Sequence, residues 1–194
     1  MTAERDSIRQ LKTAQRKQCT DARRAMTESD RSAASREICA RLAAMPEARS
    51  AAVIMSYAAA WDEADMSIFN AWALAEGKTV AYPITRGGGE MDAAVPVDET
   101  AFERGKFGIY SPVRERSQII APESIDLIIV PCVGFDGACR RLGHGGGYYD
   151  RFLGKCPSAR CIAVAFEAQR LDAAACEEHD RPVDAVVTEK TIYR

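Results

Sequence analysis

The sequence has few of the features that mark a zinc-binding, membrane-spanning or nucleic-acid-binding protein. Two histidines and seven cysteines without a C-x-x-C pair make a poor ligand set for zinc. The net charge of -2 argues against indiscriminate binding to nucleic acid, which depends on clustered lysine and arginine. The longest strongly apolar run, residues 127–130, is far too short to cross a bilayer. We therefore expect reduced thiols and neither a nucleic-acid nor a membrane partner.

Signals for targeting, linkers and repeats are also missing. The first residues, MTAERDSIRQLK, are partly acidic and have no apolar core of the kind that a secretory signal carries. A length of 194 residues suits one domain with a sizeable core, and no stretch has the composition of an interdomain linker. The sequence therefore predicts a single cytoplasmic domain over residues 1–194.

Helical periodicity is clearest at the start of the chain. Over residues 5–26 an apolar stripe recurs at about 100° per residue, and it consists of Ile8, Leu11, Cys19, Ala22 and Met26. The same spacing gathers basic side chains on the flank of that stripe; they are Arg9, Lys12, Arg16 and Arg23. By itself this basic flank is most simply a solvated helix face. Capping residues at 27–30 and Pro46 predict a second helix, in which Ile38 and Leu42 stack one turn apart.

Short apolar runs alternate with helical stretches in the rest of the chain. Strands are predicted at 51–56, 79–82, 125–130, 160–165 and 185–188, with Pro83 closing the second. A helix at 66–75 ends at Gly77, and a glycine turn at 87–89 leads to an extended segment at 91–97. Strands separated by helices predict an α/β fold, a Rossmann-like three-layer α/β/α arrangement around a mainly parallel, mixed sheet.

A glycine-rich segment follows the strongest predicted strand. Ligands of open α/β sheets bind beyond the carboxyl ends of the strands, so chemistry is expected here. Four glycines precede a predicted helix at 148–153, and their backbone amides, with the first amides of that helix, can close on phosphate oxygens. Arg140 and Arg141 add positive charge upstream, and Asp150 offers a carboxylate to magnesium. The glycines are Gly143, Gly145, Gly146 and Gly147.

The glycine-rich loop matches neither of two well-known nucleotide motifs. A Walker A sequence needs G-x-x-x-x-G-K-[ST], and Tyr148 stands where the dinucleotide fingerprint G-x-G-x-x-G has its last glycine. Glycines serve ordinary tight turns just as readily. Glycine content alone therefore leaves a phosphate loop and a plain turn between strand and helix equally open.

The residues around this loop resemble the signature of the 5-formyltetrahydrofolate cyclo-ligases, also called methenyltetrahydrofolate synthetases. The signature residues are Val130-Pro131, Phe135-Asp136, Arg141-Leu142-Gly143 and Gly145-x-Gly147-Tyr148-Tyr149-Asp150. The resemblance implies an enzyme that uses ATP and magnesium to cyclise 5-formyltetrahydrofolate to 5,10-methenyltetrahydrofolate, releasing ADP and phosphate. In that reaction the N5-formyl oxygen attacks the γ-phosphate, N10 adds to the activated carbon, and phosphate leaves.

The resemblance also implies roles for single residues. Lys12 and Arg16 match a basic pair four residues apart in the family's first helix, and with Arg141 they are the expected catalytic cations. Glu63 is the expected acceptor for the pterin, and Asp150 with Asp184 is the expected metal pair. The expected ATP contacts are Lys12, Arg16, Arg141, Leu142, Gly143, His144, Gly145, Gly146, Gly147, Tyr148 and Tyr149. The expected folate contacts are Glu63, His144, Gly145, Gly146, Gly147 and Tyr148.

Plainer interpretations stay open for several of these residues. Asp184 can cap or pair, His144 can line the loop or act as a base, and His179 more simply orders the C-terminal turn. Successive helical positions point about 100° apart, so one of Tyr148 and Tyr149 is expected to be a core aromatic.

Three positions depart from the family pattern. Cys132 and Cys139 stand where glycine is usual, and a cysteine with φ above zero costs about 1 kcal/mol or more. Ser111 stands where many relatives carry glutamate. The two cysteines allow a redox-sensitive pair beside the loop, but inert thiols are the expectation.

Two other functions compete with the cyclo-ligase interpretation. One is a non-catalytic folate- or nucleotide-binding protein on this fold, and the other is an ATP-using enzyme with a different substrate. Retention of the phosphate-facing cations together with two candidate metal ligands favours catalysis, because a pure binder needs neither. The expected partners are ATP and 5-formyltetrahydrofolate; a monomer is the expectation, although the sequence itself is silent on the oligomeric state.

Overall fold

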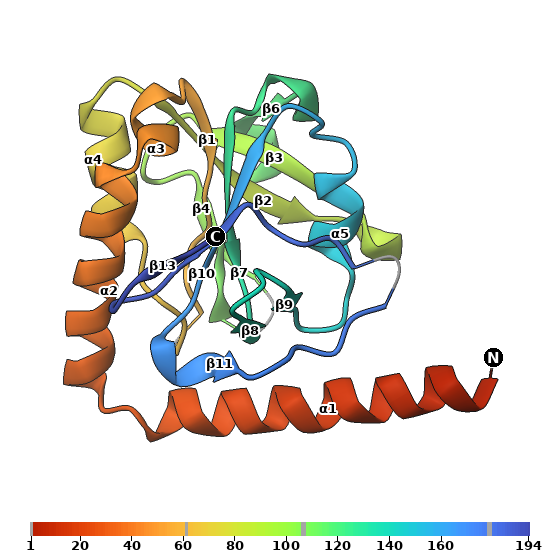
Figure 1. Ribbon diagram of the computed structural model, residues 1–194. Helices are drawn as coiled ribbons and strands as arrows, with labels where there is room; N and C mark the ends of the chain where they lie inside the picture. The colour runs from red at the N-terminus through yellow and green to blue at the C-terminus, as the bar shows by residue number, and fades with distance from the viewer. Residues whose placement is uncertain (1, 61, 106–107, 178–179) are drawn as a thin grey trace.

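The computed structural model describes residues 2–60, 62–105, 108–177 and 180–194, and an eight-stranded sheet forms the centre of this part of the chain (Figure 1). The strands lie in the order β13-β12-β10-β7-β1-β2-β3-β6. The five neighbours from β12 to β2 run parallel, and antiparallel strands flank them. The bounds are β1 Val53–Met55, β2 Thr79–Thr85, β3 Met91–Pro96, β6 Ser117–Ile120, β7 Leu127–Pro131, β10 Arg160–Val164, β12 Ala185–Val187 and β13 Ile192–Tyr193.

Helices cover both faces of the sheet, so the predicted three-layer α/β/α arrangement is confirmed (Figure 1). One face packs against α2, α3 and α4, and the other packs against α5. Side chains of β7 alternate between the faces: Leu127 and Ile129 lie in the first cluster, Ile128 and Val130 in the second. Coverage on both sides explains why this strand is an unbroken apolar run. The helix bounds are α2 Glu28–Ala44, α3 Pro46–Ser50, α4 Ser67–Ala75 and α5 Tyr148–Leu153.

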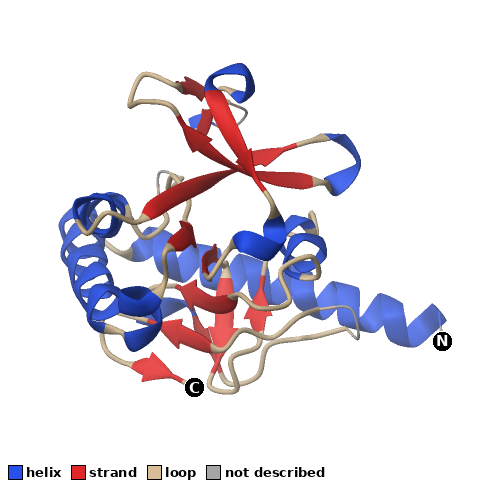
Figure 2. Ribbon diagram, turned by 90° about the horizontal axis from the view of Figure 1, so that it is seen from above, coloured by secondary structure: helices blue, strands red, loops and turns tan. Residues whose placement is uncertain are grey.

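The first helix, α1 (Thr2–Ala25), lies across the carboxyl edge of the parallel strands, and its N-terminal end extends past the rest of the molecule (Figure 1, Figure 2). It contacts a small sheet with the order β11-β8-β9. A Cβ on Gly134 would lie 2.6 Å from the Cys19 Sγ, so glycine is what lets α1 come this close. The bounds of the small sheet are β8 Gly134–Asp136, β9 Arg141–Leu142 and β11 Arg170–Leu171.

The predicted helix is confirmed, but its predicted buried stripe is wrong in part. Leu11 is 52% exposed, whereas Lys12 and Arg23 are buried beside Cys19. The reason is that α1 packs on the small sheet and its loops instead of a broad apolar face of the main sheet; Cys19 joins a small apolar cluster there. Its inward side therefore carries basic residues with carboxylate partners; Arg23, for example, donates to Asp62 at 2.9 Å. Part of the basic flank is thus the buried side of the helix.

Most predicted element ends are confirmed by local geometry. The Thr27 hydroxyl accepts from the Asp30 amide at 3.1 Å and caps α2, in which Ile38 and Leu42 are fully buried. Gly77 follows α4 with φ of 75°, the left-handed conformation of a helix end. Pro46 differs slightly from expectation: α2 ends just before it, and it opens the short helix α3.

The prediction that Pro83 closes a strand is wrong, because β2 continues through it to Thr85. Pro83 pairs with Ala93 of β3, while β1 pairs with β2 only as far as Ala81. At Pro83 one side of β2 therefore has no partner strand. The N–H that proline lacks is not needed for strand pairing there.

Several short elements had no counterpart in the sequence pattern. A two-stranded ribbon pairs β4 (Phe102–Arg104) with β5 (Tyr110–Pro112). Within the described residues, 3-10 turns without a predicted counterpart lie at Arg114–Arg116, Pro122–Ser124 and Glu167–Gln169, whereas the one at Gly87–Gly89 is the predicted glycine turn. Among the helices of the described residues, none combines the length and apolar character that a bilayer crossing requires.

Candidate active site

The carboxyl edge of the parallel strands brings together four segments that are far apart in sequence. They are α1, the loop that follows β1, the glycine-rich loop between β9 and α5, and the segment before β12. Each of the first three supplies a residue that the sequence singled out, and the fourth supplies the two carboxylates that pair with Lys12 of α1. This convergence places the site where open α/β sheets bind ligands.

The glycine-rich loop is shaped by two left-handed residues, Gly145 with φ of 97° and Gly147 with φ of 66°. Gly147 is the N-cap of α5 and has no side chain to cap the first amides of that helix. From α1, the Arg16 Nε donates to the Gly143 carbonyl at 2.8 Å. A Cβ on Gly145 would lie 3.5 Å from the Arg16 guanidinium, so the arginine rests directly on the loop.

Arg141 approaches the same loop from β9 and forms a buried ion pair with Asp150 of α5. Its Nη2 donates to the Asp150 Oδ1 at 2.6 Å, and the arginine side chain is 4% exposed. The Asp150 Oδ1 also accepts from the Arg181 amide at 3.3 Å. Within the described residues, the Asp150 Oδ2 has no hydrogen-bond partner, and the Arg141 Nε is buried without one. A polar site with such unmade bonds is prepared for a ligand.

Lys12 is almost fully buried and lies between two carboxylates that the sequence prediction did not include. Its Nζ donates to Glu177 and to Asp180, both at 2.6 Å. Burial by itself lowers the pKa of Lys12, but the hydrogen bonds to Asp180 and Glu177 outweigh it and raise that pKa above its usual value. Lys12 therefore stays charged. His179, which the sequence assigned to the C-terminal turn, lies outside the described residues.

Glu63, in the loop after β1, meets the glycine-rich loop at His144. The His144 Nε2 lies 3.1 Å from the Glu63 Oε1, and the Glu63 Oε2 accepts from the Ala60 amide at 3.0 Å. Burial, and then the negative charge of Glu63, raises the pKa of Tyr57 and of Tyr149. Both phenols therefore stay neutral. Glu63 has the buried Tyr57 and the half-buried Tyr149 within electrostatic reach, and the exposed His144 in contact.

The two consecutive tyrosines of α5 differ in their neighbours, as their helical spacing predicts. Tyr148 lies beside the loop, with the Arg151 guanidinium 5.9 Å from its ring centre. Tyr149 lies within electrostatic reach of Glu63 and Arg141. Both side chains also pack against the second core cluster.

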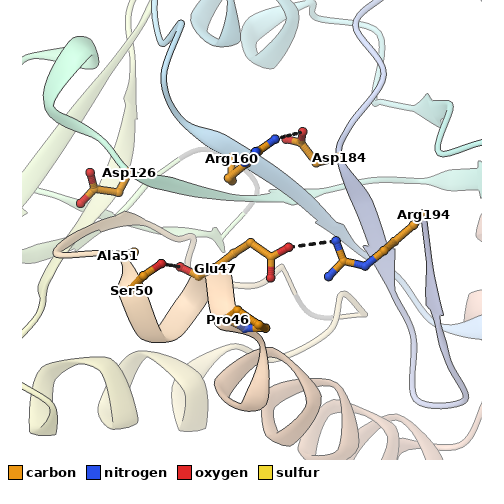
Figure 3. A pocket seen from close by; sticks show the side chains of 8 residues that line it. All are labelled: Pro46, Glu47, Ser50, Ala51, Asp126, Arg160, Asp184 and Arg194. Atoms are coloured by element: carbon orange, nitrogen blue, oxygen red, sulfur yellow. Dashed lines mark hydrogen bonds and ion pairs between the residues drawn. The ribbon is translucent and has the colours of Figure 1, made fainter.

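Asp184 lies at the opposite edge of the sheet, immediately before β12. Its Oδ2 accepts from the Cys161 amide at 2.7 Å, and its Oδ1 pairs with Arg160 at 3.1 Å. Figure 3 shows it in a cavity of about 510 Å³, across from the pair formed by Glu47 and Arg194. These contacts differ from those of Asp150, so the structure does not bring the expected metal pair together. The metal role of Asp184 stays a prediction without support from its surroundings.

The departures from the family pattern have distinct surroundings. Cys139 has φ of 58° and is the one non-glycine residue of the described chain in the left-handed region; Cys132 is not in that region. Burial raises the pKa of Cys132 to about 12 and that of Cys139 above its usual value, which supports inert thiols. The Ser111 hydroxyl donates to the Pro83 carbonyl at 3.3 Å, a contact between β5 and β2.

Comparison with known proteins gives this arrangement a family. A profile of the 5-formyltetrahydrofolate cyclo-ligase family matches residues 5–189. This chain belongs to the 5-formyltetrahydrofolate cyclo-ligase family. The profile spans α1, the glycine-rich loop and the segment before β12, so each part of the carboxyl-edge site lies within the family match.

Individual relatives agree with the cyclo-ligase assignment. A probable 5-formyltetrahydrofolate cyclo-ligase of Schizosaccharomyces pombe is 32% identical over 136 residues, which are 63% of this chain and 67% of that protein. The 5-formyltetrahydrofolate cyclo-ligase of Mus musculus is 37% identical over 79 residues, 38% of this chain and 39% of that protein. The NMR structure of Aquifex aeolicus 5,10-methenyltetrahydrofolate synthetase is 31% identical, has a TM-score of 0.83 and covers 95% of this chain and 92% of that chain.

The predicted family, fold and enzyme class, a ligase, are thereby confirmed. These comparisons assign the chain to a family, and the roles of single residues remain predictions. Sequence reasoning missed Glu177 and Asp180 as the partners of Lys12. A usable signal was present, because Asp180 lies only four residues before Asp184, the aspartate that the resemblance assigned to the metal.

Proposed function

We propose that this chain converts ATP and 5-formyltetrahydrofolate to ADP, phosphate and 5,10-methenyltetrahydrofolate at the carboxyl edge of its sheet. The observation that carries the proposal is the meeting of Arg16 and Arg141 at the glycine-rich loop, beside Glu63. The cations would hold a polyphosphate, and the carboxylate would hold a pterin.

The phosphate half of the proposed site rests on charge and on access to backbone amides. The Arg16 Nε is fixed by the Gly143 carbonyl, which leaves the rest of its guanidinium over Gly145. Arg141 lies on the other side, 3.4 Å from the position of a Cβ on Gly143. Phosphoryl transfer depends mainly on such positioning and on neutralising charge, because the chain itself has little covalent chemistry to supply.

A divalent cation fits the charge balance of this site. Among the described residues of the site, three cations accompany three carboxylates. The site therefore has no net positive charge to offset the negative charge of a polyphosphate. Magnesium favours one or two carboxylates together with phosphate oxygens, and the Asp150 Oδ2 meets that requirement. When bound, magnesium would neutralise part of the negative charge on the phosphates. The cations are Lys12, Arg16 and Arg141, and the carboxylates are Asp150, Glu177 and Asp180.

For the second carboxylate of the metal site, we propose Asp180 instead of Asp184. Asp180 binds Lys12, and the amide of the next residue, Arg181, donates to Asp150. Asp184 has its partners at the amino edge. The contact network therefore links Asp150 to Asp180 and not to Asp184.

The folate half of the proposed site rests on Glu63. Its carboxylate would accept pterin N–H groups in place of its contact with His144, with the neutral Tyr57 and Tyr149 around it. The N5-formyl oxygen then forms a bond to the γ-phosphorus as ADP leaves. N10 adds to the activated carbon and gives up its proton to water, the C–O bond breaks, and the oxygen departs with phosphate. A formamide oxygen is a weak nucleophile, so the alignment of the two substrates would supply most of the acceleration.

One assay tests this function against its alternatives. The purified protein is mixed with ATP, magnesium and 5-formyltetrahydrofolate, and the near-ultraviolet absorbance of methenyltetrahydrofolate is followed together with ADP release. We expect equal amounts of both products and no turnover with a chelator present. Folate binding without turnover would indicate a binding protein. Consumption of ATP only with another acceptor would indicate an enzyme with a changed substrate.

A further inference from the structure

Arg151, the residue after Asp150, joins two loops that the proposed function does not otherwise connect. Its Nε donates to the Gly89 carbonyl at 2.9 Å, and its Nη2 donates to the Gly146 carbonyl at 2.6 Å. Gly89 belongs to the turn between β2 and β3, and Gly146 belongs to the glycine-rich loop. One guanidinium of α5 thus bridges two backbone segments.

The two loops leave just enough space for this guanidinium. A Cβ on Gly89 would lie 1.7 Å from the Arg151 Nη2, and a Cβ on Gly147 would lie 2.9 Å from its Nη1. Both distances are below any real Cβ contact, so both positions need glycine for Arg151 to pass between them. A second ion pair supports the same junction, because Lys155, two residues after the end of α5, pairs with Glu90, which directly follows the turn.

The bond to Gly146 has a consequence for the next amide. In a planar trans peptide, the C=O and the following N–H point in opposite directions. Because Arg151 holds the Gly146 carbonyl toward itself, the Gly147 N–H points away from Arg151. That amide is one of the loop donors to which the proposed function assigns a phosphate.

We propose that Arg151 is a positioning residue for ATP: it fixes the Gly146–Gly147 peptide and uses the turn at Gly89 as its support. The inference rests on the proposed function, because it concerns the same phosphate loop. Arg151 acts through the backbone and not by touching the reacting atoms. Its loss therefore raises KM for ATP more than it lowers kcat.

A pair of glycine substitutions tests this without altering Arg151 itself. Gly88 and Gly89 both have positive φ, 73° and 79°, so alanine brings a similar backbone strain at each. A Cβ on Gly88 meets no atom within 4 Å, whereas one on Gly89 displaces Arg151. We expect Gly89→Ala and Arg151→Ala each to raise KM for ATP about tenfold, equivalent to about 1.4 kcal/mol. Gly88→Ala should stay within about twofold of the wild type, less than about 0.5 kcal/mol on the same scale.

The double variant Gly89→Ala/Arg151→Ala completes the test. If the glycine acts through the arginine, the double variant has the KM of either single variant, and Arg151→Lys recovers part of the loss. Equal effects of Gly88→Ala and Gly89→Ala, or additive effects in the double variant, would overturn the proposal.

Hydrogen exchange separates a failure of this inference from a failure of the proposed function. Arg151→Ala should speed exchange of the amides in residues 143–149, whether or not the protein turns over ATP. A wild-type protein without cyclo-ligase activity would refute the proposed function alone. Unchanged exchange in that segment would refute the positioning role of Arg151.

Discussion

The two edges of the parallel sheet both carry paired charges, but they bury them to different extents. At the carboxyl edge the Lys12 and Arg141 side chains are 7% and 4% exposed, while at the amino edge those of Arg160 and Arg194 are 66% and 56% exposed. Exposed pairs contribute about 0–1 kcal/mol, because water screens them. Desolvated charges are costly unless every partner is present.

This difference indicates which edge has a use for its charges beyond stability. Apolar residues of similar size often stabilise a fold as well as a buried ion pair does. The carboxyl edge nevertheless keeps buried cations against a glycine-rich loop, while the amino edge keeps its charges at the surface. Perturbed, desolvated charges in a cleft are typical of functional sites. The two edges therefore provide matched pairs of residues for experiments.

The largest difference in activity is expected between variants of Asp150 and variants of Asp184. Asp150→Asn should lower kcat/KM at least about a hundredfold, the order of magnitude lost with one precisely placed polar group. It removes the carboxylate that pairs with Arg141 and that we assign to magnesium. Asp184→Asn alters a half-exposed pair at the other edge and should stay within about threefold of the wild type. Steady-state kinetics with varied magnesium measure both.

Stability must be measured beside this activity, because Asp150→Asn leaves the Arg141 charge without its partner. Thermal unfolding should identify a folded Asp150→Asn protein before its kinetics are interpreted. If Asp184→Asn loses as much activity as Asp150→Asn and as much magnesium dependence, the metal pair expected from the sequence is correct and the contrast between edges fails.

Asp136 and Asp126 give the next largest contrast, in stability. Asp136 is fully buried and accepts hydrogen bonds from the amides of Ala138, Arg140 and Ala174 and from the Arg140 guanidinium. Asp126 is exposed and, among the described residues, accepts from two amides at the start of β1. We expect Asp136→Asn to lower the free energy of unfolding by about 3 kcal/mol and Asp126→Asn by about 1 kcal/mol. Urea unfolding at neutral pH measures both.

The difference in stability between the wild type and Asp136→Asn should shrink as the pH falls. Burial raises the pKa of Asp136, but the amides of Ala174, Arg140 and Ala138 and the Arg140 side chain lower it more, so the folded pKa is below its ordinary value. A lowered pKa adds stability that is present above the unfolded pKa of about 3.9 and is lost as pH falls through the folded value. Unfolding of wild type and Asp136→Asn should therefore converge in acid; a constant gap would contradict this assignment.

How far the sequence predicts the fold depends on the length of each element. The β7 strand was evident because both of its faces are covered, and the ends of α2 and α4 were evident because Thr27 and Gly77 have specific backbone roles. Strands such as β9 and β11 have two residues each, which is too short for any periodicity. Tertiary pairing, and not local preference, creates these strands.

Sequence reasoning named Lys12 and Arg16 through the family resemblance, because their helical spacing alone indicates only a solvated face. It did not find the partners of Lys12: Lys12 and Glu177 are 165 residues apart, so no local pattern could join them. The sequence prediction for Asp184 did not consider at which edge of the sheet the residue lies. A residue directly before a parallel strand lies at the opposite edge from a loop that follows one, and Asp184 directly precedes β12.

The smallest contrast in stability is expected from the backbone, between Cys139 and Cys132. Both are buried, but only Cys139 is left-handed, with φ of 58°. Alanine removes the sulfur and keeps the strain, whereas glycine also removes the strain, so we expect Cys139→Gly to be about 1 kcal/mol more stable than Cys139→Ala. At Cys132 the order should reverse. We expect Cys132→Gly to be about 0.5–1 kcal/mol less stable than Cys132→Ala, because glycine gives the unfolded chain more conformational freedom to lose on folding. Chemical unfolding of the four variants measures both differences, and the same order at both positions would show that backbone strain at Cys139 contributes nothing.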